Sequence, residues 1–148
     1  MKTKKQIGTI KKLFISNKSD KKRESKESIE VDLQGILNDK FYDKDFNRAV
    51  LLTSLFAYDI MQKDNIEVRF GQLGENILVD FNPYELKKGT QLFIDDTILE
   101  ITTECTICNL LKKIDDKVPA LLKNDRGVFA KVIKNGHIKL NATIHIIN

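Results

Sequence analysis

Cys105 and Cys108 offer the clearest chemistry in this chain, because the two thiols stand three positions apart at a change of secondary structure. Apolar and β-branched residues alternate over 97–103, which predicts a strand. From Ile107 onward apolar residues recur at helical spacing, which predicts a short helix. Cys108 then falls in the first turn of that helix, where unpaired backbone amides and the helix dipole favour an anion.

The surroundings of Cys108 predict a reactive thiol. Thr106 can cap the helix, and Lys112 lies one turn later on the same side. Such a cysteine ionises more readily than a free one, and the thiolate is the form that attacks, binds metal or carries sulfur. The alternative is a buried, inert cysteine beside the core, since free cysteine is among the most buried residue types.

Two other uses of the cysteine pair are open. A CxxC pair is half of a zinc site, which His137 and His145 would have to complete at an unusual spacing. A thioredoxin-like redox motif belongs to a βαβ setting, and the sequence does not indicate one. Two cysteines this close do not make a disulfide framework, so we expect a reducing, cytoplasmic compartment.

Length and composition indicate one globular domain. The 148 residues are 41% hydrophobic and 31% charged, and a chain of this length buries a core without disulfides or metal. No apolar run approaches the length of a membrane span, so we expect no membrane partner. The Lys-rich N-terminus lacks the apolar stretch of a signal peptide.

Positive charge is concentrated near the N-terminus. Residues 1–26 hold ten Lys or Arg against two acids, a charge of +8, which leaves −4 for the rest of a chain whose net charge is +4. Residues 16–28 contain no hydrophobic side chain and predict a mobile charged loop between two strands. No aromatic residue interleaves with these charges, so base stacking is not indicated and we expect no nucleic-acid partner.

The remaining pattern is mainly β. Strands are predicted over 5–16, 29–33, 48–53, 76–80, 91–94, 97–103, 127–134 and 137–147. A helix is predicted over 54–63, and Leu52, Leu55, Phe56 and Ile60 form its inner stripe. Asp95-Asp96 and Asn135-Gly136 are predicted hairpin turns. Many strands, short helices and no βαβ rhythm favour a closed or nearly closed β-barrel.

Seven short motifs follow one another along the chain. They are Gly35–Asp39, Arg48–Leu52, Gly71–Val79, Leu86–Gly89, Glu104–Cys108, Arg126–Val132 and Asn135–Lys139. In this order they resemble the MOSC domain, which occurs at the C-terminal end of molybdenum cofactor sulfurases and in small stand-alone bacterial proteins. The resemblance implies a single domain over residues 1–148. It also implies a β-barrel like the one inserted in pyruvate kinase, with a few short helices.

The resemblance also implies a function built on one cysteine, for which Cys108 is the best match and Cys105 a weaker one. In one branch of the family that cysteine ligates the metal of the molybdenum cofactor (molybdopterin). In the sulfurase branch it carries a persulfide received from a cysteine desulfurase, so pyridoxal phosphate enters only through that partner. Other implied partners are proteins of molybdenum cofactor biosynthesis and molybdoenzymes. A further branch implies a molybdenum-dependent reductase of N-hydroxylated compounds, which needs an electron donor.

Four other residues occupy matched positions. Glu75 and Asn76 belong to the family's Gly-Glu-Asn turn, and the resemblance implies that they hydrogen-bond the pocket or the pterin. Arg48 and Arg126 are expected near the pterin phosphate or a molybdenum oxo group, because a guanidinium presents a planar fork of donors. The alternatives are a turn that satisfies only its own backbone and ordinary surface ion pairs.

The chain departs from the family pattern in two places. Asn38–Phe41 stands where Gly-Asp-Arg-His is common, so the histidine is missing. Asn141–Thr143 replaces the usual Gly-Asp-Pro. The sequence shows no pyridoxal-binding lysine motif, and we therefore expect this protein to work with a partner or a bound cofactor.

Overall fold

The computed structural model describes residues 3–20, 22–105 and 108–147, except for the side chains of 108–110. The strands are β1 (Lys4–Ser16), β2 (Arg23–Lys26), β3 (Ser28–Asp32), β4 (Gly35–Ile36), β5 (Val50–Ser54), β6 (Ile77–Val79), β7 (Gln91–Ile94), β8 (Thr97–Glu104), β9 (Val128–Lys134), β10 (Gly136–Lys139) and β11 (Thr143–Ile147). The helices are α1 (Leu55–Lys63), α2 (Cys108–Ile114) and α3 (Val118–Leu121), with 3-10 turns η1 (Phe46–Arg48) and η2 (Pro83–Glu85).

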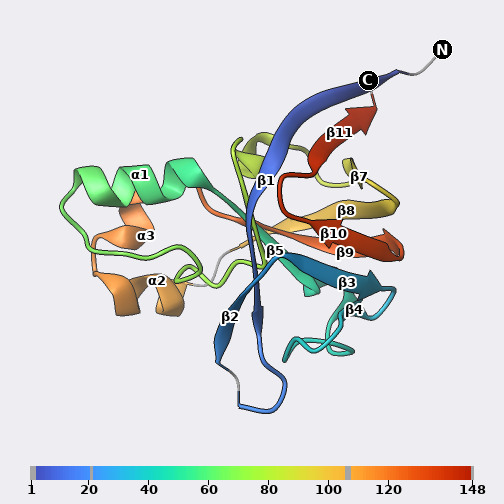
Figure 1. Ribbon diagram of the computed structural model, residues 1–148. Coiled ribbons are helices and arrows are strands. Elements are labelled where there is room, and N and C mark those ends of the chain that lie inside the picture. The colour runs from blue at the N-terminus through green and yellow to red at the C-terminus, as the bar shows by residue number, and fades with distance from the viewer. Residues whose placement is uncertain (1–2, 21, 106–107, 148) are drawn as a thin grey trace.

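Seven strands form a closed barrel in the order β11-β7-β8-β9-β5-β6-β1, and β1 pairs back with β11 (Figure 1). The β5–β6 pair is parallel, and the other pairs around the barrel are antiparallel. Strand β2 extends the sheet beyond β1, and β10, β3 and β4 form a second small sheet. The predicted fold class, a mainly β barrel with a few short helices, is confirmed.

Aliphatic side chains fill the barrel, and a second apolar cluster lies outside it. Alternate residues of each strand point inward, as Val128 and Ala130 of β9 do. Leu78 of β6 instead packs with Met61 of α1 and Leu111 of α2 in the second cluster. The helices therefore form a layer on the outer face of the barrel (Figure 1). In the described ranges, no helix has the length and apolar character that crossing a membrane requires.

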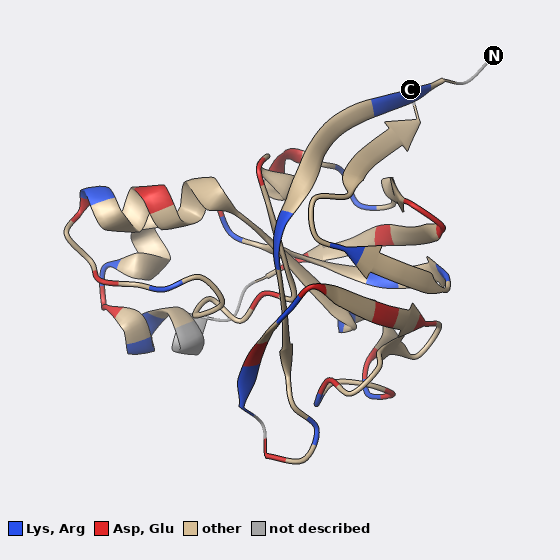
Figure 2. Cartoon of the chain, in the orientation of Figure 1, with Lys and Arg blue, Asp and Glu red and all other residues tan. Residues whose placement is uncertain are grey.

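The structure changes the interpretation of residues 16–28. The segment was predicted as a loop, but residues 23–26 form β2, which pairs with Leu13–Ser16 of β1. Long-range contacts hold this strand in place, since Arg23 lies over the Phe14 ring and donates a hydrogen bond to the Glu75 carbonyl. Figure 2 shows basic residues at intervals along β1 and β2, and the sequence of β2, Arg-Glu-Ser-Lys, also includes one acid.

Two other predictions are wrong in detail. The predicted strand 137–147 is divided into β10 and β11 at Asn141, whose φ of 67° is left-handed. The amide of Asn141 donates to the carbonyl of Ile10, so the chain turns there from the small sheet into the barrel. On α1 the buried residues are Ala57, Tyr58 and Met61, whereas Phe56 is exposed. Leu55 and Ile60 are half-buried against the outer cluster as predicted, so the predicted inner face is wrong for Phe56 and lacks Ala57, Tyr58 and Met61.

Candidate functional site

The segments that carry predicted site residues are joined across neighbouring strands of the barrel wall. The amide of Cys105, just after β8, donates to the carbonyl of Gly127 at 2.8 Å. Two residues further, Phe129 of β9 pairs with Leu51 of β5. The Leu51 amide donates to Oδ1 of Asn76 at 3.0 Å, just before β6 begins. The barrel register therefore joins segments that are far apart in the sequence.

Arg48 stands on the outward side of this row. Phe129 lies between Val128 and Ala130, whose side chains belong to the barrel core, so its ring points outward. The Arg48 guanidinium lies over that ring, 5.4 Å from its centre. Its only ion partner among the described residues, Asp45, is 4.0 Å away at an exposed position. The Phe129 ring therefore positions the Arg48 guanidinium, which remains accessible to solvent.

The backbone around Arg48 is fixed by its neighbours. Asp45 caps η1, accepting a hydrogen bond from the Asn47 amide at 3.0 Å. The Thr102 hydroxyl donates to the Asn47 carbonyl, which attaches η1 to β8. These bonds explain why three residues of 3-10 helix keep one position on the barrel wall.

Arg126 lies just before β9, against α3. Its Nη2 donates to the Pro119 carbonyl at 3.2 Å, while its Nε is buried and has no hydrogen-bond partner among the described residues. Burial and a hydrogen bond to Glu104 raise the pKa of the nearby Tyr84. The positive charge of Arg126 acts in the opposite direction and lowers that pKa. A buried cationic donor without an acceptor is costly, so this position suits an anionic ligand.

Glu75 is fully buried between α1 and the loop that leads to β6. Its Oε2 accepts hydrogen bonds from the Tyr58 hydroxyl at 2.6 Å and from the Gly71 amide at 3.1 Å. Its Oε1 has no hydrogen-bond partner in the described part of the chain. Burial raises the pKa of Glu75, and this outweighs the lowering by Tyr58, Gly71 and the charge of Arg23. The protonated acid is therefore favoured more than at a surface glutamate.

Tyr58 fastens the loop to α1. Its hydroxyl also accepts hydrogen bonds from the amides of Gly71 and Leu73, at 3.0 and 3.2 Å. Burial raises the pKa of Tyr58, as does the charge of Glu75, so the hydroxyl stays protonated and donates to the carboxyl. Gly71 has a φ of 92°, and a Cβ there would lie 3.1 Å from the Phe14 ring. The tight loop therefore requires glycine at this position.

Asn76 is buried and bridges two strands. Its Nδ2 donates to the Phe14 carbonyl at 3.2 Å, and its Oδ1 accepts from the Leu51 amide. Its backbone bonds the same two residues, at 2.8 Å in each case. These contacts describe a structural turn residue, and hydrogen bonding of Asn76 to a pterin stays a prediction.

Cys108 begins α2, but its side chain lies outside the described atoms, and its predicted cap Thr106 lies outside the described residues. Leu111, three residues later, is buried in the cluster that contains Leu73. The start of α2 thus belongs to the same outer layer as the loop that carries Glu75. Among the described residues, no group of three or more His, Cys, Asp or Glu is arranged to hold a metal ion.

Arg23 is a site candidate that the sequence did not indicate. Besides its stacking on Phe14, its Nη1 donates to the Ser16 hydroxyl at 3.1 Å and its Nη2 to the Glu75 carbonyl. Desolvation of the guanidinium lowers the pKa of Arg23, whereas the negative charges of Glu75 and Asp39 raise it. Because the ordinary pKa of arginine is so high, Arg23 remains charged at neutral pH. No local pattern marks Arg23, because its main partner is 52 positions away.

The profile of the MOSC domain matches residues 34–145. The chain belongs to the MOSC domain family. This family is associated with molybdenum cofactor-related proteins. The matched range of the MOSC domain contains all five predicted site residues, Arg48, Glu75, Asn76, Cys108 and Arg126, whereas Arg23 lies before it.

Solved structures share the fold of this MOSC domain. The YuaD protein of Bacillus subtilis is 15% identical, with 100% of this chain and 99% of that chain covered and a TM-score of 0.81. YiiM of Geobacillus stearothermophilus is 10% identical, with 99% and 76% covered and a TM-score of 0.69. YiiM of Escherichia coli is 14% identical, with 95% and 70% covered and a TM-score of 0.67. No curated protein sequence matches.

Proposed function

We propose that this MOSC domain binds the molybdenum cofactor or carries sulfur for it, with Cys108 as the reacting residue. The observation that supports the proposal is the buried Nε of Arg126, which has no hydrogen-bond partner among the described residues and lies next to Gly127, whose carbonyl accepts from the Cys105 amide three residues before Cys108. A cysteine thiolate suits both roles, because soft sulfur ligates molybdenum and also forms persulfides.

The residues around this face fit an anionic cofactor. The Nε of Arg126, which lacks a hydrogen-bond partner among the described residues, and the exposed guanidinium of Arg48 are donors of the kind that a phosphate accepts from. The raised pKa of Glu75 favours its uncharged form, which does not repel an anion. We therefore assign phosphate binding to Arg48 and Arg126 and molybdenum ligation to Cys108. When bound, the cofactor would supply the redox and sulfur chemistry of its metal centre.

In the carrier role, the sulfur comes from a persulfide on a pyridoxal-phosphate-dependent cysteine desulfurase. The Cys108 thiolate attacks the outer sulfur of that persulfide, a new S–S bond forms, and the desulfurase cysteine leaves as a thiolate. No external oxidant is required, because the sulfane sulfur passes between two thiols. The acceptor would be a protein of molybdenum cofactor biosynthesis or a molybdoenzyme.

Metal and pterin analysis of protein made in a molybdenum-replete host tests the proposal and separates the two roles. A cofactor holder retains molybdenum and pterin together, and Arg126→Ala should reduce both without unfolding the protein. Lys139→Ala, an exposed cation on β10, serves as the control. A pure carrier retains neither but accepts sulfur from a desulfurase. A protein that does neither would contradict the proposal.

A further inference from the structure

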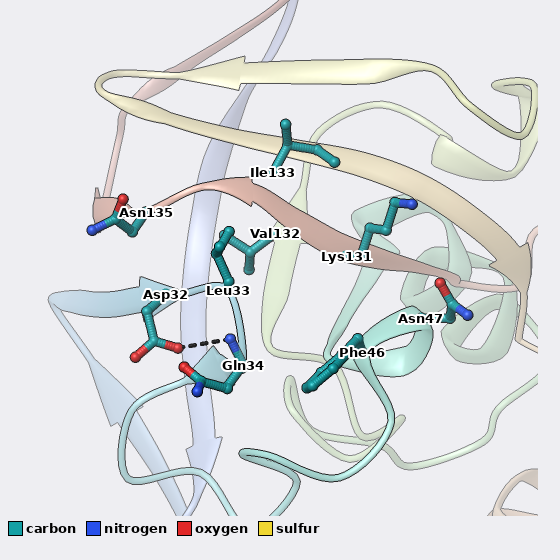
Figure 3. A pocket seen from close by; sticks show the side chains of 9 residues that line it. All are labelled: Asp32, Leu33, Gln34, Phe46, Asn47, Lys131, Val132, Ile133 and Asn135. Carbon is teal, nitrogen blue, oxygen red and sulfur yellow. Dashed lines mark hydrogen bonds between the residues drawn. The ribbon is translucent and has the colours of Figure 1, made fainter.

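A groove of about 800 Å³ lies along β9, between η1 and the turn that joins β3 to β4 (Figure 3). Lys131 and Ile133 of β9, Phe46 of η1 and Leu33 of the turn line it. Phe129, which lies under Arg48, is two residues before Lys131 on the same strand. The groove therefore adjoins the outward face that carries the candidate site.

Apolar side chains are exposed in this groove to an unusual degree. Leu33 is 60% exposed, Phe46 53% and Ile133 38%. They make up three of the seven large hydrophobic residues that are exposed in the described ranges. A local concentration of exposed apolar surface is typical of a binding site.

Hydrogen bonds fix both walls of the groove in advance. On one wall, Asp32 accepts from the Gln34 amide at 2.8 Å, which closes the turn that presents Leu33. On the other, the cap by Asp45 and the bond from Thr102 hold Asn47, next to Phe46. Exposed apolar groups on a fixed backbone lose little entropy when they bind a ligand.

The two charged side chains that line the groove, Asp32 and Lys131, differ in how readily they can bind a ligand. Asp32 is already engaged, because its other carboxylate oxygen accepts from the Tyr42 hydroxyl at 2.5 Å, a bond that raises the pKa of Tyr42 to about 12. Lys131 is more accessible, with a single ion partner among the described residues, Glu100 at 3.4 Å, and a partly exposed side chain. An ammonium has three donors, so Lys131 can also bind an anionic group of a ligand.

We propose that this groove binds a small molecule with a flat, mainly apolar body and one anionic group. The body would lie against Leu33, Phe46 and Ile133, and the anion would face Lys131. The volume is that of a small-molecule site, which favours such a ligand over a protein segment. Binding of this ligand to the groove does not depend on the function proposed for Cys108.

Two fluorescent probes test the proposal on the purified full chain. Anilinonaphthalene sulfonate has the proposed chemistry, and phenylnaphthylamine has the same body without the anion. The sulfonate should bind at one saturable site. Phe46→Ala should weaken it about tenfold, the loss of one aromatic contact at a binding hot spot. Phe56→Ala is the matched control, because Phe56 is 49% exposed but lies on α1. Ile133→Ala provides a second groove variant.

Lys131→Gln tests the anionic end. This variant should weaken binding of the sulfonate several-fold and leave phenylnaphthylamine unchanged, whereas Lys134→Gln on the same strand should affect neither. Cys108→Ser should leave both probes bound, so the groove is tested separately from the proposed function. Weak, unsaturable binding, or equal losses in the Phe46 and Phe56 variants, would overturn the proposal. A dimer in sedimentation that Phe46→Ala dissociates would also overturn it, with a second copy as the occupant.

Discussion

Replacing Glu75 separates its hydrogen bonds from its charge. Glu75→Ala removes the acceptor for the Tyr58 hydroxyl and the Gly71 amide, at 2.6 and 3.1 Å. The Tyr58 proton is then buried without an acceptor, which costs about 1–3 kcal/mol, and the lost methylene burial adds about 1 kcal/mol. We expect a total loss of about 3 kcal/mol in the free energy of unfolding. Glu75→Gln keeps an acceptor and should cost less than about 1 kcal/mol in acid.

The pH dependence follows from the raised pKa of Glu75. The unfolded chain ionises this group near its ordinary value of 4.5, but the folded protein holds the proton to higher pH. The stability that the protonated acid contributes is present below the unfolded value and is lost as pH rises through the folded pKa. The wild type should therefore lose stability relative to Glu75→Gln as the solution becomes less acidic.

Urea unfolding over about pH 4 to pH 8 measures both effects. Glu67→Gln and Glu67→Ala are the controls, because Glu67 is exposed in the segment that follows α1. If the curves of the wild type and Glu75→Gln stay parallel at every pH, Glu75 ionises normally and the reasoning is wrong. A loss in Glu75→Ala no larger than in Glu67→Ala would refute the role of the Tyr58 hydrogen bond.

Two further predictions concern the barrel. The Asp80 carboxylate accepts two hydrogen bonds from Thr9, both 2.7 Å long. These bonds outweigh the effect of burial and lower the pKa of Asp80. Asp80→Asn should therefore lower the free energy of unfolding by about 1 kcal/mol at neutral pH, and by less in acid. Melting temperatures at two pH values check this, and an equal loss in acid would contradict it. A Cβ on Gly127 would lie 2.6 Å from both the Leu52 carbonyl and the Thr53 hydroxyl, so Gly127→Ala should lose about 2 kcal/mol in urea unfolding. An unchanged midpoint would mean that β9 can shift there.

The barrel was predictable because its strands follow local rules. The alternation over 91–94 and 97–103 matches β7 and nearly all of β8, and the turn at Asp95-Asp96 joins them. The inner face of α1 was only partly predictable, since Leu55 and Ile60 pack inward but Phe56 does not. Tyr58 is buried with a hydrogen bond to Glu75, and spacing within the helix does not indicate such a contact.

The site was only partly predictable for a related reason. Short motifs identify Arg48, Glu75 and Arg126. They do not indicate that Glu75 is buried, with one oxygen lacking a hydrogen-bond partner in the described part of the chain. Arg23 could not be found, because its segment is polar throughout and only the folded barrel brings it to the Glu75 carbonyl. The groove beside η1 was likewise missed, since its walls come from three separate segments of the chain.

The most direct test of the central claim is a count of sulfane sulfur and molybdenum on wild type, Cys108→Ser and Cys105→Ser. Each protein is incubated with a cysteine desulfurase plus cysteine, or with the molybdenum cofactor, and analysed by intact-protein mass spectrometry and metal analysis. Serine preserves side-chain size but removes the soft, readily ionised sulfur. We predict that Cys108→Ser loses sulfur or molybdenum loading while Cys105→Ser keeps it and both remain folded. Loading of Cys108→Ser at the wild-type level would contradict the claim, and the family relationship would then account only for the shared barrel.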